Sequence, residues 1–135
     1  MKQIISFVLM LGLILPLTAA KQDVDEAFKD VEHVEGTSIY FDEEVHDFGE
    51  IEEGVQATHV FKFYNNGDEP LIINRVRPSC GCTVSEYTRE PVQPGEAGEI
   101  HAEYDSNNRG GNFSTSIRVN SNAGTDVLRI TGEVK

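Results

Sequence analysis

The sequence predicts an all-β protein, specifically an antiparallel β-sandwich of immunoglobulin-like topology with about seven strands. From residue 38 onward, apolar side chains recur at every second position in short segments, which is the period of a half-buried strand. Clusters of Gly, Asn, Asp and Pro separate these segments at short intervals, as they do in sandwiches. No helix-length periodic segment follows residue 38, and half-polar strands favour antiparallel pairing over a parallel sheet.

The predicted strands follow one another along this region. They comprise residues 38–42, 45–51, 56–65, 71–77, 80–87, 99–105, 112–120 and 126–134. In the strand 99–105, Ile100, Ala102 and Tyr104 are expected to point inward, because they alternate with polar side chains. The segment 65–70, "NNGDEP", is a predicted turn, since Asn and Gly tolerate a positive φ and Pro ends the turn.

The first twenty residues have the composition of a secretory signal peptide. Lys2 supplies the positive start, residues 4–15 are apolar, and Thr18, Ala19 and Ala20 form a small-residue cleavage site. The apolar run is shorter than the roughly 20 residues of a membrane-spanning helix. We therefore expect export, a periplasmic or secreted location, and no membrane span in the mature chain.

An acidic leader, residues 21–37, is expected between the signal peptide (1–20) and the sandwich domain (38–135). Apolar residues within 23–35 lie near helical spacing, so a short helix is predicted there. The full chain carries a formal net charge of −12, and residues 21–53 hold thirteen acids against two lysines, a net of −11. Because no basic stripe is evident along the chain, nucleic acid is not an expected partner.

The two cysteines, Cys80 and Cys82, are separated by one glycine. In a regular strand such side chains lie about 6.5 Å apart, from the rise per residue, whereas a disulfide needs Cβ atoms about 3.5–4.5 Å apart. Three interpretations follow: a disulfide or thiol pair that shapes a tight loop at Gly81, a Cu(I) site, or thiol–disulfide exchange. His59 or His101 could complete a metal site, although a packed or exposed histidine is the simpler interpretation of each.

Residues 42–54, "DEEVHDFGEIEEG", are rich in carboxylates but lack the residue order of a calcium loop. The simplest interpretation is a charged edge strand, since charge on an edge blocks unwanted strand pairing. A looser calcium site in this segment is the alternative.

The motifs "HDFGEIEEG", "FKFYNNGDEPLII", "PSCGCT", "PVQPGEAGEI" and "IRVNSN…LRITGEV" together resemble the secreted bacterial domain-of-unknown-function family fifteen-seventy-three, over roughly residues 40–135. Its hallmark is an S-C-G-C-T segment that follows an F-x-F-x-N-x-G-x-x-P-L run. The matching residues here are Ser79, Cys80, Gly81, Cys82 and Thr83, preceded by Phe61, Phe63, Asn65, Gly67, Pro70 and Leu71. The resemblance implies an exported immunoglobulin-like sandwich, similar to modules of major-sperm-protein and PapD-like type, with no assigned activity.

Three functions are consistent with these observations. The first is a non-enzymatic interaction or assembly module at the cell envelope, which needs no cofactor and binds an envelope or extracellular protein through its sheet edges. The second is a small thiol protein that binds Cu(I) or exchanges disulfides through Cys80 and Cys82. The third is a polysaccharide-binding or adhesive role, which the four Tyr and the absence of Trp disfavour.

Overall fold

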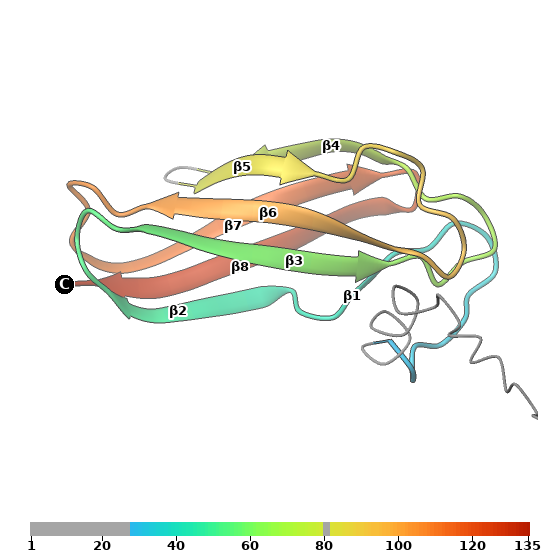
Figure 1. Cartoon of the computed structure of the whole chain (residues 1–135), viewed down its shortest axis with the longest axis horizontal. Helices are drawn as coiled ribbons and strands as arrows, with labels where there is room; N and C mark the ends of the chain where they lie inside the picture. The colour runs from blue at the N-terminus through green and yellow to red at the C-terminus, as the bar shows by residue number, and fades with distance from the viewer. Residues whose placement is uncertain (1–27, 80–81) are drawn as a thin grey trace, which may run out of the picture.

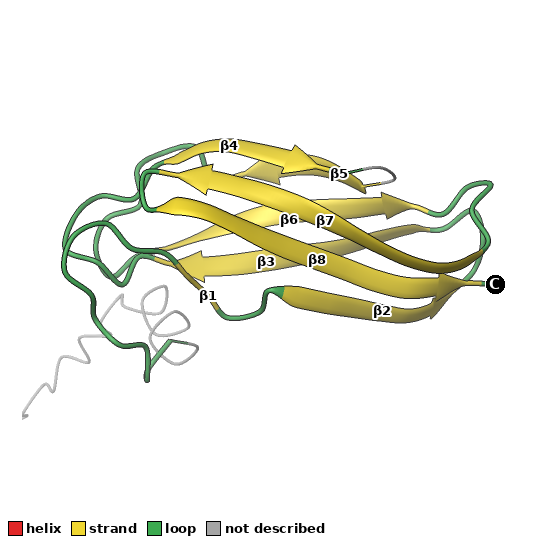
Figure 2. Ribbon diagram, turned by 180° about the vertical axis from the view of Figure 1, so that it is seen from behind, coloured by secondary structure: helices red, strands yellow, loops and turns green. Residues whose placement is uncertain are grey.

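The computed structural model describes residues 28–79 and 82–135, which form a sandwich of two facing sheets (Figures 1 and 2). Each sheet has four strands. The strands are β1 (Tyr40–Phe41), β2 (Val45–Ile51), β3 (Gln56–Tyr64), β4 (Ile73–Pro78), β5 (Cys82–Tyr87), β6 (Ala97–Asp105), β7 (Gly111–Ser121) and β8 (Gly124–Val134). Each of them overlaps a predicted strand, and the described residues contain no helix.

The strand order is β1-β3-β6-β5 in one sheet and β2-β8-β7-β4 in the other. All pairs are antiparallel except one, because β2 runs parallel to β8. The predicted β-sandwich of about seven strands is confirmed, and the β2–β8 pair is the one exception to antiparallel pairing. The chain leaves β1 in one sheet and enters β2 in the other after three residues, and β2 keeps the direction of β1 (Figure 1).

Each sheet contains one long strand pairing at its centre. β3 pairs with β6 over nine consecutive residues, and β7 pairs with β8 over eleven. Apolar side chains from both sheets fill the space between them. The fully buried members of this core are Phe61, Phe63, Leu71, Ile100, Ile117, Val119, Leu128 and Ile130. The predicted inward residues of 99–105 are confirmed, since Ile100, Ala102 and Tyr104 are all buried.

The predicted helix at 23–35 is wrong for its described part, residues 28–35. A turn at 28–30 is followed by irregular chain, which lies against the loop between β3 and β4. Val34 N donates to Asn66 O at 2.8 Å and Asp68 N donates to Gly36 O at 2.8 Å. These bonds to the loop satisfy backbone groups that an isolated short helix would have to satisfy internally, and such a helix is marginal in water.

The apolar contact of this segment comes from Phe28. Its ring is buried and stacks on Tyr64 with 4.9 Å between the ring centroids. The leader is thus docked on the sandwich from residue 28 onward. The predicted signal peptide and the leader residues before Phe28 lie outside the described residues.

None of the described residues forms a helix long and apolar enough to cross a membrane.

Candidate functional site

The S-C-G-C-T segment lies where the chain passes from β4 in one sheet to β5 in the other. Its first residue is bonded to β7, because Ser79 Oγ accepts a hydrogen bond from Ser116 N at 2.8 Å and contacts the Thr115 hydroxyl. Cys82 N donates to Ser79 O at 3.1 Å, so these two described residues lie close together. Cys80 and Gly81 lie outside the described residues, so a disulfide between Cys80 and Cys82 stays a prediction.

Cys82 is a free, buried thiol, while the next residue, Thr83, is exposed. In the sheet Cys82 lies opposite Tyr104 of β6. Burial raises the pKa of the Cys82 thiol to about 11. At neutral pH the group is therefore protonated, whereas a nucleophile or a metal ligand would have to be a thiolate. This property disfavours a Cu(I) or exchange role for Cys82.

The raised pKa predicts a specific loss of stability in alkali. The thiol of the unfolded chain ionises at its ordinary pKa, whereas the folded thiol stays protonated up to about pH 11. Its contribution to the free energy of unfolding is therefore complete below pH 9 and is lost as the pH rises through 11. Urea unfolding between pH 8 and 11 should show a steeper loss for Cys80→Ser than for Cys80→Ser/Cys82→Ala. Parallel curves for the two proteins would contradict the prediction.

Neither predicted histidine partner reaches Cys82. His59 lies on β3, and β6 separates β3 from β5. His101 lies on β6 but alternates with the buried Ile100 and Ala102, and its Nε2 contacts Glu99 Oε2 at 3.0 Å. Neither ring is placed beside the buried Cys82 thiol, and the simpler interpretation, a packed or exposed histidine, describes both residues.

The F-x-F-x-N-x-G-x-x-P-L residues build the fold. The side chains of Phe61, Phe63 and Leu71 are in the core. Asn65 is buried, and its amide donates to Glu69 O and Val92 O, each at 2.8 Å. A Cβ added to Gly67 would lie 2.2 Å from Gly36 O, so this glycine permits the close approach of the leader. Pro70 is exposed, and its carbonyl accepts a bond from Asn122.

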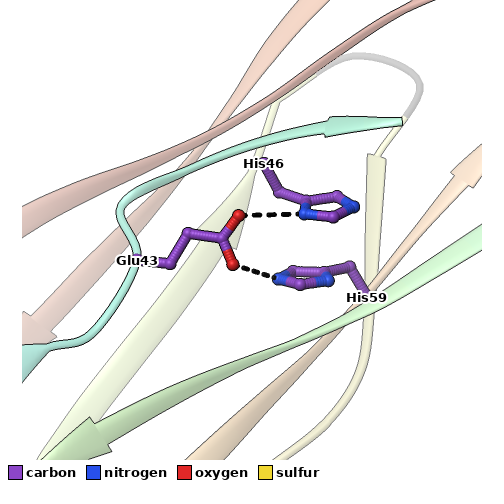
Figure 3. Close-up of side chains that lie close together, drawn as sticks. All are labelled: Glu43, His46 and His59. Carbon is purple, nitrogen blue, oxygen red and sulfur yellow. Dashed lines mark hydrogen bonds and ion pairs between the residues drawn. The ribbon is translucent and has the colours of Figure 1, made fainter. Parts of the chain in front are cut away.

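A cluster of ligand-type side chains lies at the opposite seam between the sheets. Glu43 is in the crossing between β1 and β2, His46 is in β2, and His59 is in β3 (Figure 3). His46 Nδ1 lies 2.9 Å from Glu43 Oε1, and His59 Nε2 lies 3.1 Å from Glu43 Oε2. The two imidazoles stack with 3.6 Å between centroids and 9° between planes. Among the described residues, these three are the one group of three or more His, Cys, Asp or Glu spaced to hold a metal ion.

This cluster replaces the calcium alternative for residues 42–54, because imidazole nitrogens outnumber the carboxylate in it and calcium takes oxygen ligands. The rest of the segment behaves as expected: β2 is an edge strand. Its ladder shifts register between Asp47 and Glu50, and Asp47 Oδ1 accepts a bond from Gly49 N at 2.8 Å.

A second feature lies on the outer face of the β2-β8-β7-β4 sheet. Four exposed arginines gather there, and we call them the arginine face: Arg75, Arg77, Arg118 and Arg129. Arg77 lies directly opposite Arg118 in the ladder. No described carboxylate forms an ion pair with any of the four, and Arg129 donates to Ser114 Oγ at 2.9 Å. A hollow of about 160 Å³ lies between Arg77, Ser79 and Arg118.

The expectation that no basic stripe exists is therefore wrong. The arginines come from three strands whose residues are up to 54 positions apart, so no run of basic residues appears in the sequence. The available signal was the outward alternation of Arg75 and Arg77 along one strand. For the histidine cluster, no comparable signal exists, because Glu43, His46 and His59 meet only through the crossing between sheets.

The described residues form a β-sandwich module, and the PapD-like domain 7 of human CEP192 shares this fold, superposing with a TM-score of 0.60. That match has 8% identity and covers 72% of this chain and 84% of that one. The model of a family described as a protein of unknown function, DUF1573, matches residues 39–134. The chain belongs to this family, as its motifs indicate.

Two further structures share the fold. A protein of unknown function from Porphyromonas gingivalis W83 superposes with a TM-score of 0.62 at 15% identity, over 78% of this chain and 50% of that chain. The secreted serine protease VesC from Vibrio cholerae gives 0.56 at 14% identity, over 73% of this chain and 23% of that chain. The sequence thus spans half the length of the first and about a quarter of the second. No curated protein matches the chain.

Proposed function

We propose that this protein is an exported, non-enzymatic interaction or assembly module of the bacterial cell envelope, and that its arginine face binds an acidic segment of a partner protein. The observation that carries this proposal is the direct pairing of Arg77 with Arg118 without a described carboxylate beside either. Like charges directly opposite one another destabilise a sheet. An anionic partner relieves that repulsion, since carboxylates accept paired hydrogen bonds from guanidinium groups.

The charge distribution favours a short acidic segment over a nucleic acid. The chain as a whole has a formal net charge of −12, so a long phosphate backbone is repelled on either side of the arginines. On the same outer face, Asp47, Glu50 and Glu133 surround the hollow at the far end. A partner segment is complementary to this face when its acidic side chains lie over the arginines.

The arginine face is a better binding surface than the four edge strands, β1, β2, β4 and β5. β1 has only two residues, and β2, β4 and β5 each contain a register shift. The exposed edge strand β4 also ends in Pro78, which has no N–H to donate to an added strand. Such irregularities are the usual protection against strand addition.

A charge-reversal experiment tests the proposal. A fluorescent peptide of eight Glu and Asp residues serves as the probe, and its anisotropy is measured against the tag-free protein. Arg77→Glu/Arg118→Glu should weaken binding by about tenfold or more, because it replaces two attractive charges with two repulsive ones. The matched control is Arg89→Glu/Arg109→Glu, which makes the same change in net charge away from the arginine face and should bind as the wild type does.

Equal binding by both double variants would overturn the assignment of the arginine face. Tighter binding of a DNA oligonucleotide or an anionic polysaccharide than of the peptide would overturn the choice of a protein partner. Envelope extracts that repeatedly yield no cross-linked partner, together with a measured turnover, would overturn the proposal of a non-enzymatic module.

A further inference from the structure

The two sheets meet at a seam between β2 and β3, where most of the edge of β3 is unpaired in the described part of the chain. β1 covers only Phe63 and Tyr64 of β3, and the chain then crosses into the other sheet. The rest of that edge of β3 therefore has no strand paired to it among the described residues. His46 and His59 meet across this gap, and Glu43 bridges them from the crossing segment (Figure 3).

The spacing of the three side chains suits a metal ion. In a tetrahedral site with bonds of about 2.0–2.1 Å, neighbouring ligand atoms lie about 3.3 Å apart. Each imidazole nitrogen lies near that separation from a different oxygen of the Glu43 carboxylate, His46 Nδ1 at 2.9 Å from Oε1 and His59 Nε2 at 3.1 Å from Oε2. All three ligand atoms lie within 4.8 Å of one another.

One atom of the cluster lacks a hydrogen-bond partner. His59 Nε2 is inaccessible to solvent, and its 3.1 Å contact with Glu43 Oε2 does not have hydrogen-bond geometry. A buried polar atom without a partner is costly.

We propose that Glu43, His46 and His59 form a binding site for a divalent transition-metal ion of the Zn²⁺ type, which joins the sheet-crossing segment to β3. Two imidazoles and one carboxylate are a ligand set of zinc sites, and the fourth position is taken by water. Calcium and magnesium prefer oxygen ligands, so this set selects against them.

The site has an entrance and apolar walls. The exposed fractions of the side chains rise from 19% for His59 through 27% for His46 to 40% for Glu43, so an ion enters from the Glu43 side. The Phe61 ring meets the His59 ring, and the Phe48 ring meets the His46 ring, at nearly a right angle, each pair with 4.7 Å between the ring centroids.

Binding requires one local movement. Parallel stacked rings cannot both aim an in-plane lone pair at the same ion, so the imidazoles must rotate about χ2. This torsion is broad for histidine, so the rotation is accessible without moving the backbone. The loss of the parallel stack on metal binding is itself an observable consequence.

The test uses tag-free full-length protein carrying Cys80→Ser, so that the thiol pair cannot supply ligands. Titration with ZnCl₂ by calorimetry should show one site, and Co²⁺ should give the intense visible bands of a tetrahedral complex. Glu43→Gln and His46→Gln should each weaken Zn²⁺ binding by about tenfold or more, in the range seen when metal-site groups are lost. His101→Gln is the matched control, since that histidine also contacts a glutamate but has no third ligand beside it, and binding should be unchanged.

NMR of the histidine rings detects metal binding in a protein whose Glu43, His46 and His59 are all unchanged. Zn²⁺ should shift the Nδ1 resonance of His46 and the Nε2 resonance of His59, with His33 and His101 unaffected. Absence of a site in the calorimetric titration, weak octahedral Co²⁺ bands, or equal loss of affinity in the His101→Gln control would overturn the proposal. The metal-site proposal is independent of the proposed function of the arginine face, because the metal and the peptide bind different residues.

Discussion

Replacing Asn65 with alanine is expected to lower the free energy of unfolding by roughly 3–5 kcal/mol, since each buried polar group left without a partner costs about 1–3 kcal/mol. The Asn65 side chain is 0% exposed. It donates to Glu69 O and Val92 O, and its Oδ1 accepts from Gly67 N at 2.9 Å. Alanine removes all three bonds and leaves the buried Gly67 N without its acceptor, although Val92 O keeps the bond from Leu71 N. It also releases the loop after β3 from the residues that precede β6.

Urea unfolding followed by circular dichroism measures this effect. A small domain has only about 5–15 kcal/mol of stability, so the variant should be at the margin of folding. Asn66→Ala is the neighbouring control, because the Asn66 side chain donates one hydrogen bond, to Glu32 O. Its loss should cost about 1 kcal/mol, the usual net value of one such bond. Equal losses for the two variants would show that Asn65 does not organise this loop.

Replacing Gly98 with alanine should destabilise the sandwich by about 1–3 kcal/mol through overpacking. Gly98 lies opposite Phe63 in the β3–β6 ladder, and the Phe63 ring covers it. An added Cβ would lie 2.3 Å from Phe63 Cζ and 2.7 Å from Cε2. The ring is fully buried and cannot move without displacing its neighbours.

A double-mutant cycle identifies the clash as the cause. Phe63→Leu alone should be destabilising, but Gly98→Ala in that background should cost far less than in the wild type, because the smaller side chain vacates the space above residue 98. Gly110→Ala is the matched control, since an added Cβ there meets nothing within 4 Å. Additive effects of the two substitutions, or an equal cost at Gly110, would contradict this explanation.

The local features of the fold were predictable because each depends on neighbouring residues. Alternation with a period of two placed β2 at its observed bounds and directed Ile100, Ala102 and Tyr104 into the core. The predicted helix before residue 36 failed for the opposite reason. Its periodic spacing competes with long-range bonds to the loop after β3, such as that from Val34 N to Asn66 O, and the tertiary contacts prevail.

The candidate sites depended on pairings that the sequence pattern does not carry. Arg77 and Arg118 are 41 residues apart and become neighbours only because β4 pairs with β7. His46 and His59 face each other only because the chain changes sheets after β1. Cys82, in contrast, was recognised as a candidate from its motif, while its burial and raised pKa depended on its position opposite Tyr104.

By itself, the sequence determined which residues form strands, which faces are apolar and which loops turn tightly, since these properties follow from backbone sterics and side-chain period over a few positions. Only the tertiary structure decided that β2 runs parallel to β8, that four arginines share one open face, and that Glu43 contacts two stacked histidines. The physical reason is that strand pairing joins residues far apart in the chain, and its choice rests on the combined burial of both sheets rather than on any local preference.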